Sequence, residues 1–428
     1  MRLEVGSIFI KDVRLGEQTV IDRGVLYVHG EELVEKLRVD DRLASVSVEV
    51  ARPGESVRIV PVKDVIEPRV KVTGSGDSFP GFTGRVHTTG EGRTHVLKGM
   101  AVVTVGPVVG FQEGIIDMSG AGAEYTPFSQ TVNLVLDCRV RSGLTQREHE
   151  EALRLAGLRA AVYLGEAGRS VAPDELRVFE SHPLGQASDC YPGLPRVAYV
   201  YMLQSQGLLH DSYVYGVDAK SMLPTLIGPT EVMDGAIVSG NCVSACDKNT
   251  TYHHQNNPII EELFLRHGRD LNFVGVVITN ENVTLVDKER SSSYTSKLVA
   301  MLGVDGVIIS EEGFGNPDTD LIMNCRKLEA RGIRTVLVTD EYAGRDGASQ
   351  SLADADPAAD AVVTAGNANA LIALPAMERV IGQLAPVEKI AGGFDGSLAP
   401  DGSVVVEIQA ITGATNELGF GRLSTKGY

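Results

Sequence analysis

The densest group of reactive side chains lies in residues 240–257, which read Gly-Asn-Cys-Val-Ser-Ala-Cys-Asp-Lys-Asn-Thr-Thr-Tyr-His-His-Gln-Asn-Asn. In this stretch Cys242 directly follows Asn241. A few per cent of an ordinary thiol is ionised near neutrality, and the thiolate is a strong nucleophile. Cys242 can therefore attack the Asn241 carbonyl and convert the peptide bond into a thioester. The pattern marks Asn241–Cys242 as a candidate self-cleavage site.

This N-to-S acyl shift is uphill from a relaxed amide, so it requires local strain, a base and donors for the developing oxyanion. Nearby side chains of suitable type are the candidates for processing or support: Thr250, Thr251, His253, His254 and Cys246. Three outcomes are open. Hydrolysis leaves a free N-terminal Cys242, as in N-terminal-nucleophile hydrolases. Elimination converts Cys242 into dehydroalanine, which hydrolyses to a pyruvoyl group. Cyclisation of the Asn241 side chain normally uses a preceding His, and Gly240 stands there.

The same stretch also contains four residue types that bind zinc, namely Cys242, Cys246, His253 and His254. The spacing is unfavourable, because adjacent imidazoles rarely reach one metal ion together. We expect no metal site, and we expect Cys138 and Cys325 to be small buried hydrophobic residues.

Composition narrows the class of protein. A chain of 428 residues predicts two or three domains. The net charge of −17 argues against a nucleic-acid binder, which needs a basic surface. No stretch approaches the roughly 18 apolar residues of a membrane helix, and charges interrupt the apolar N-terminal residues. Five scattered cysteines indicate a reducing compartment, so we expect a cytoplasmic protein with no membrane partner.

The predicted elements form an α/β protein with a β-rich N-terminal domain followed by a doubly wound, parallel-sheet C-terminal domain. We expect a β-rich domain over 1–130, an α/β segment over 131–241 that ends at the cleavage site, and a pyruvoyl-bearing α/β domain over 242–428. Alternating strands are predicted at 45–50 and 57–62. Short apolar runs at 273–278, 306–309, 335–338 and 360–363 are separated by predicted helices near 293–303 and 318–331. This alternation is typical of a parallel sheet covered on both faces.

One helix and several acidic strand ends carry specific expectations. Thr145 and Glu148 form a capping box for a helix over 145–164, with a buried stripe at Leu153, Ala156, Ala160 and Leu164. The pairs Glu311–Glu312 and Asp340–Glu341 end predicted strands, and ligands bind at this edge of open sheets. We interpret these acids as solvated strand ends, and Asp318 and Asp320 as residues that begin a helix.

Several longer sequence motifs resemble those of a known protein family. It resembles the α/β-subunit proprotein of component B, the substrate-binding component of glycine, sarcosine and betaine reductases. The resemblance covers essentially the whole length and is carried by 92–104 (Gly-Arg-Thr-His-Val-Leu-Lys-Gly-Met-Ala-Val-Val-Thr), 110–120 (Gly-Phe-Gln-Glu-Gly-Ile-Ile-Asp-Met-Ser-Gly), 124–129, 218–220 and 229–257. It implies that the bond between Asn241 and Cys242 is cut and that Cys242 becomes a pyruvoyl cofactor.

The resemblance also implies a mechanism and partners. The pyruvoyl carbonyl would form a Schiff base with a small amino-acid substrate. A selenocysteine on the gamma subunit of component B would then attack the substrate carbon, and the carboxymethyl group would pass to selenoprotein A. We therefore expect a hetero-oligomer. The printed sequence contains no selenocysteine, so the nucleophile must lie on another chain.

The substrate of such a reductase carries a carboxylate, which needs a cationic docking point. Candidates within the matched motifs are Arg93, Lys98, Lys220 and Lys248. Betaine is a quaternary ammonium and cannot form a Schiff base, so a carbonyl mechanism favours glycine or sarcosine. The alternative functions are an N-terminal-nucleophile (Cys) amidohydrolase generated by cleavage at Asn241–Cys242, and a metal-stabilised scaffold subunit.

Overall fold

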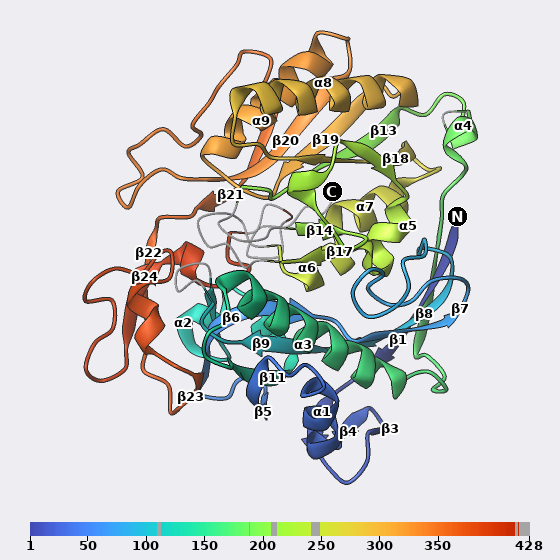
Figure 1. Ribbon diagram of the computed structural model, residues 1–428. Helices are drawn as coiled ribbons and strands as arrows, with labels where there is room; N and C mark the ends of the chain where they lie inside the picture. Colours follow the sequence, from blue (N-terminus) through green and yellow to red (C-terminus); the bar gives the residue numbers. More distant parts are fainter. Residues whose placement is uncertain (109–112, 188, 207–211, 241–248, 416–417, 419–428) are drawn as a thin grey trace.

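The protein is described by a computed structural model that covers residues 1–108, 113–187, 189–206, 212–240, 249–415 and 418. Its fold is mixed α/β, as predicted, and contains several sheets (Figure 1). The figure shows one group of strands with α3 in its lower half and another group with α8 and α9 in its upper half. The elements α6, β14 and β17 lie between them.

Two larger sheets form most of the N-terminal part, beside a small three-stranded sheet of order β2-β4-β3, built from β2 (Asp12–Leu15), β3 (Val20–Asp22) and β4 (Val25–Val28). A four-stranded sheet has the order β12-β1-β8-β7, built from β1 (Arg2–Phe9), β7 (Arg69–Thr73), β8 (Gly92–Lys98) and β12 (Glu175–Glu180). A six-stranded sheet has the order β10-β6-β9-β11-β5, and β23 pairs with β6. Its strands are β5 (Leu43–Ala51), β6 (Val57–Ile66), β9 (Met100–Val105), β10 (Gly114–Asp117), β11 (Val132–Val140) and β23 (Arg379–Gly382). The predicted strands at 45–50 and 57–62 lie within β5 and β6.

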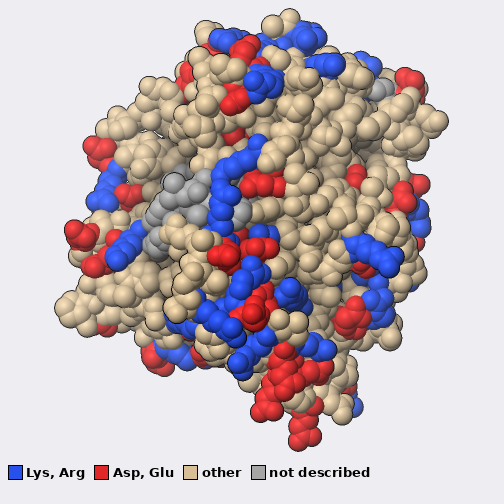
Figure 2. Space-filling model, viewed as in Figure 1, with Lys and Arg blue, Asp and Glu red and all other residues tan. Residues whose placement is uncertain are grey.

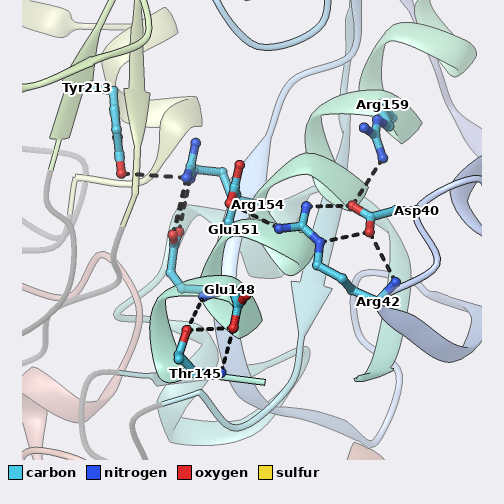
Figure 3. A network of polar contacts seen from close by, with 9 residues as sticks. Asp40, Arg42, Thr145, Glu148, Glu151, Arg154, Arg159 and Tyr213 are labelled. Carbon is cyan, nitrogen blue, oxygen red and sulfur yellow. Dashed lines mark hydrogen bonds and ion pairs between the residues drawn. The ribbon is translucent and has the colours of Figure 1, made fainter. Parts of the chain in front are cut away.

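Helix α3 (Gln146–Glu166) covers this part of the molecule, and its predicted capping box is present. The Thr145 hydroxyl accepts a hydrogen bond from the Glu148 amide, while the Glu148 carboxylate accepts one from the Thr145 amide. The predicted apolar stripe is fully buried. The helix also buries Glu150 and Arg154 on the side that faces β14, as Figure 3 shows for Arg154 and Tyr213.

The predicted parallel sheet is present and has six strands in the order β16-β18-β13-β19-β20-β21. They are β13 (Arg196–Leu203), β16 (Thr225–Ile227), β18 (Asn272–Asn280), β19 (Gly306–Glu311), β20 (Arg334–Glu341) and β21 (Val362–Asn367), and only β16 runs antiparallel to its neighbour. Side chains of α7 (Pro258–Arg266) pack in the core on one face, and those of α8 (Leu285–Leu302) and α9 (Asn316–Glu329) pack on the other. β13 precedes position 241, yet it lies between β18 and β19.

Smaller elements connect these sheets. A three-stranded sheet has the order β15-β14-β17, from β14 (Ser212–Val214), β15 (Val217–Asp218) and β17 (Ile237–Ser239). The other pieces are β22 (Leu371–Leu374), β24 (Val404–Glu407), α1 (Gly30–Leu37), α2 (Gly120–Ala123), α4 (Leu184–Ala187), α5 (Pro229–Glu231) and α6 (Thr251–Gln255). Acidic and basic side chains are interspersed over the face seen in Figure 2.

Candidate processing site

The structure describes residues on both sides of the candidate cleavage bond. β17 ends at Ser239 and is followed by Gly240, and the chain is described again from Asn249, just before α6. Four predicted residues lie outside the described residues: Asn241, Cys242, Cys246 and Lys248. The site is therefore built from its two flanks, which are buried at Gly240 and at Asn249 to Thr251.

Two consecutive residues of β6 hold these flanks. The Lys63 ammonium donates a hydrogen bond of 2.6 Å to the carbonyl oxygen of Gly240, the residue bonded to Asn241. The Asp64 carboxylate accepts hydrogen bonds from the Thr251 amide at 2.9 Å and from the Thr251 hydroxyl at 2.7 Å. The Thr251 hydroxyl oxygen in turn accepts the Ser239 amide at 3.0 Å. Sequence reasoning missed Lys63 and Asp64.

A shift in strand register explains how the consecutive residues Lys63 and Asp64 can both contact the flanks of the candidate site. The pairing of β6 with β9 shifts between Val62 and Asp64, as at a β-bulge. Successive side chains of a regular strand point to opposite faces, whereas a bulge re-aims one of them. Burial raises the pKa of Asp64 to about 6, while Lys63 and the Thr251 hydrogen bonds oppose this shift. Asp64 is therefore mostly ionised at neutral pH and can accept these hydrogen bonds.

The predicted residues Thr250 and His253 contact each other at the start of α6. The Thr250 amide donates to Nδ1 of His253 at 3.0 Å, and the Thr250 hydroxyl lies 2.9 Å from the same atom. Since Nδ1 accepts a hydrogen bond, the ring proton of a neutral His253 lies on Nε2. Burial, with a smaller contribution from His254, lowers the pKa of His253 to about 3. His253 is therefore a neutral hydrogen-bond donor at Nε2.

His254 belongs to a second polar row. Its Nδ1 lies 2.8 Å from the Tyr201 hydroxyl, which also accepts a hydrogen bond from the Asn249 side chain at 3.3 Å. Nε2 of His254 lies 3.6 Å from Oε1 of Glu312. Burial lowers the pKa of His254 to about 3, so this imidazole is also neutral. The row connects the C-terminal flank of the candidate site to the carboxyl edge of the parallel sheet.

The interpretation of the acidic strand ends as solvated is wrong for three of the four residues. Glu311, Glu312 and Asp340 are buried, because neighbouring loops cover this edge of the sheet. The Glu312 carboxylate accepts the Ser212 hydroxyl and the Gln204 amide. Burial, followed by the nearby carboxylates of Asp318 and Glu281, raises the pKa of Glu311 well above its usual range.

The acids assigned to a helix start lie there. Asp318 caps α9 by accepting the Gly315 amide at 2.8 Å. Asp320, one turn into the helix, forms an ion pair with Lys288 and accepts the Asn282 amide. The prediction for Asp318 is confirmed, and Asp320 has a wider role that links α8 to α9.

The cationic candidates for substrate docking are dispersed. Arg93 on β8 forms two hydrogen bonds with the Glu4 carboxylate. Lys98 forms an ion pair of 2.8 Å with Glu67 and donates to the Asn256 side chain at the end of α6. Lys220 is exposed. Among the described candidates, Lys98 contacts the residue that follows α6, and the docking role of all four cations stays a prediction.

Two of the described cysteines were expected to be small buried residues. Cys138 and Cys325 are buried, as predicted, and burial raises the pKa of Cys138 to about 12. Across the described ranges, no three His, Cys, Asp or Glu side chains are placed to hold a metal ion. None of the helices in the described part of the chain is both long and apolar enough to cross a membrane.

The flanks of the candidate cleavage bond carry two donor side chains. His253 has a neutral N–H at Nε2, while the Lys63 ammonium donates to the Gly240 carbonyl and lies 3.2 Å from the Glu150 carboxylate. The fold and these flanks define a mixed α/β protein with an anchored internal polar segment.

Comparison with known proteins shows the family to which this chain belongs. Residues 1–426 match the family model of glycine/sarcosine/betaine reductase component B subunits. The chain is 66% identical, over all of both chains, to the glycine reductase complex component B subunits alpha and beta of Peptoclostridium acidaminophilum. It is 58% identical to the sarcosine reductase complex component B subunit alpha and 38% identical to the betaine reductase complex component B subunit alpha of that organism, again over all of each chain. No solved structure matches the chain. The chain belongs to this family of reductase component B subunits and is an enzyme subunit, which confirms the resemblance seen in the motifs.

Proposed function

We propose that this chain is a self-processing, pyruvoyl-bearing, substrate-binding subunit of an amino-acid reductase of the glycine or sarcosine type. The observation that carries the proposal is the buried polar anchoring of both flanks of Asn241–Cys242 by Lys63, Asp64 and Thr251. A second support is the full-length relative named for two subunits, alpha and beta, on one chain. Cleavage after Asn241 would divide this chain into two subunits.

The proposed processing uses groups of this chain and water. The Cys242 sulfur adds to the Asn241 carbonyl carbon, the C–N bond breaks, and the nitrogen takes a proton to become a free amine. Water then takes up the Cys242 α-proton, the Cβ–S bond breaks, and its electrons leave with the sulfur of the Asn241 thiocarboxylate. The resulting dehydroalanine tautomerises to an imine, and water converts the imine to a ketone with loss of ammonia.

The described side chains have assigned parts in this proposal. His253 is assigned the role of donor to negative charge that develops on oxygen. Its Nδ1 already accepts the Thr250 amide, so its ring proton lies on Nε2. A histidine with a pKa of about 3 is a weak base at neutral pH, so His253 serves as a donor and not as the proton acceptor. Thr251 fixes the second flank through Asp64. Cys246 and Lys248 keep their predicted supporting and docking roles.

The pyruvoyl group supplies a ketone carbonyl that forms a Schiff base with a primary or secondary amine and draws electrons from its C–N bond. Glycine and sarcosine meet this requirement, whereas betaine does not. The higher identity to the relatives named for glycine and sarcosine than to the one named for betaine supports the same choice. The attacking selenocysteine is proposed to lie on the gamma subunit of component B, with selenoprotein A receiving the carboxymethyl group in a hetero-oligomer.

The two fragments are expected to stay together after cleavage, because they share sheets. β13 of 1–241 lies between β18 and β19 of 242–428, and β23 of the second fragment pairs with β6 of the first. The hydrophobic core around Tyr199 and Ile260 also contains residues from both fragments. Cleavage therefore creates a new chain end inside an intact fold.

Intact mass tests the proposal most directly. The 242–428 fragment should be lighter than its Cys-terminated form by one hydrogen sulfide and one ammonia, with one water gained, and should resist Edman sequencing. A normal N-terminal Cys would refute the pyruvoyl assignment and favour the amidohydrolase. An uncut chain that retains zinc would favour the scaffold.

Borohydride trapping tests the carbonyl and the substrate class. Reduction in the presence of labelled glycine or sarcosine should attach label to the 242–428 fragment, because borohydride makes the C=N linkage permanent. Labelled betaine is the matched control and should give no more label than a reaction without borohydride. Equal labelling of the 1–241 fragment would mean that the reactive carbonyl does not originate from Cys242.

A further inference from the structure

Lys63 is a buried lysine with two contacts that bear on the cleavage bond. It is 1% exposed, and its ammonium donates to the Gly240 carbonyl and lies 3.2 Å from the Glu150 carboxylate. Glu150, on α3, is itself completely buried and accepts from Arg154 at 3.1 Å. Arg154 lies over the rings of Phe82 and Tyr213. The position of Lys63 is therefore fixed by its ion pair with Glu150 and by the packing behind that residue. Figure 3 shows the contact between Arg154 and Tyr213.

A buried ion pair seldom adds net stability, because removing both charges from water costs several kcal/mol per ion. Here the cation is directed at a single backbone carbonyl, and the carbonyl carbon of Gly240 is bonded to the Asn241 nitrogen. Lys63 thus acts one residue before the bond that is proposed to break. The neighbouring Asp64 acts on the other flank, since Thr251 accepts the Ser239 amide while it donates to Asp64.

We propose that Lys63, held by Glu150, and Asp64, acting through Thr251, are positioning residues for self-cleavage at Asn241–Cys242. This inference rests on the proposed function. Lys63 fixes the orientation of the Gly240 carbonyl, which belongs to the peptide unit that leads into Asn241. It transfers no proton, so the bonds that form and break are those of the acyl shift described above. Together the two residues keep both flanks at a fixed separation.

The test compares Lys63→Met with Lys288→Met in the full-length chain. Lys288 is a matched control: it is also buried, pairs with a buried carboxylate and donates to a backbone carbonyl, that of Asn316. The rate at which the 242–428 fragment forms is followed by gel and intact mass. Lys63→Met should be slower by about 100-fold, the usual cost of misplacing reacting groups by about 1 Å. Lys288→Met should process at the rate of the unaltered chain.

Two further variants distinguish a positioning role of Lys63 from a general loss of stability of the fold. Lys63→Arg keeps a cation and should recover part of the rate, and Glu150→Gln, which keeps packing but removes the counter-charge, should slow processing less than Lys63→Met does. Thermal midpoints of all variants are measured alongside. If Lys63→Met matches Lys288→Met in rate, or Lys63→Arg is as slow as Lys63→Met, the inference is wrong. If the unaltered chain stays uncut or keeps an N-terminal Cys, the proposed function itself fails.

Discussion

Replacing Cys242 with alanine is expected to leave one uncut chain of 428 residues. Alanine has no nucleophile to attack the Asn241 carbonyl, so neither the thioester nor the pyruvoyl group can form. Because an amide exposed only to unassisted water is stable for far longer than any preparation, the loss should be complete. Denaturing gels and intact mass would show a single species of full length, and reductase activity in the assembled complex should fall to the level without this subunit.

Two variants make this result specific to position 242. Cys246→Ala removes the other thiol of the stretch and should still be processed, although more slowly if Cys246 supports the flank. Cys242→Ser keeps a weaker nucleophile that can follow the same route through an ester, so it should be cut slowly. Cleavage of the Cys242→Ala chain at the same bond would show that the thiol does not drive the reaction, and would favour hydrolysis by another group.

The sequence predicted the elements that have a strong local pattern. The capping box placed the start of α3, and the apolar runs placed β18, β19 and β20. The start of α8 was predicted near 293, but the helix begins at Leu285, where Thr284 caps it. The early turns were hidden because exposed Leu285 and Val286 and the serines at 291–293 do not form an amphipathic stripe.

Of the candidate site, only the residues close to the cleavage bond in sequence could be predicted. Thr250 and His253 were found because they lie within twelve residues of the cleavage bond in sequence. Lys63 lies 177 residues from Gly240 and directly follows the alternating strand predicted at 57–62. The charged pair Lys63–Asp64, which stands before further apolar residues, was the available signal, since a central strand tolerates buried charges only when they have partners. The burial of the acidic residues at the strand ends was not predicted either, because it depends on which loops, distant in sequence, cover that edge of the sheet.

Arg58→Met is expected to destabilise the protein by about 3–5 kcal/mol, the usual cost of removing one partner of a buried ion pair. Arg58 on β6 is fully buried and makes two hydrogen bonds, of 2.7 and 2.8 Å, with the Asp117 carboxylate. It also donates to the Pro375 carbonyl at 2.9 Å and the Gly402 carbonyl at 3.3 Å. Its loss therefore leaves a buried charge unpaired and weakens the contact between the proposed fragments.

The measurement is the urea midpoint for unfolding and for separation of the fragments, with Arg379→Met as control. Arg379 on the paired strand β23 forms half-exposed ion pairs with Glu49 and Glu55, so its loss should cost no more than about 1 kcal/mol. Equal midpoints for the two variants would contradict the prediction.

The pH dependence of the Arg58→Met defect has a definite sign. Burial already raises the pKa of Asp117 above its usual value, against the opposing effect of Arg58. Without Arg58 that pKa should rise further. A carboxyl group whose pKa is raised by folding destabilises the native state once it is ionised, and this penalty disappears as pH falls and the group binds its proton. The difference in unfolding free energy between Arg58→Met and the unaltered chain should therefore shrink on acidification. A difference that stays constant with pH would show that the lost backbone contacts, and not the unpaired carboxylate, account for the defect.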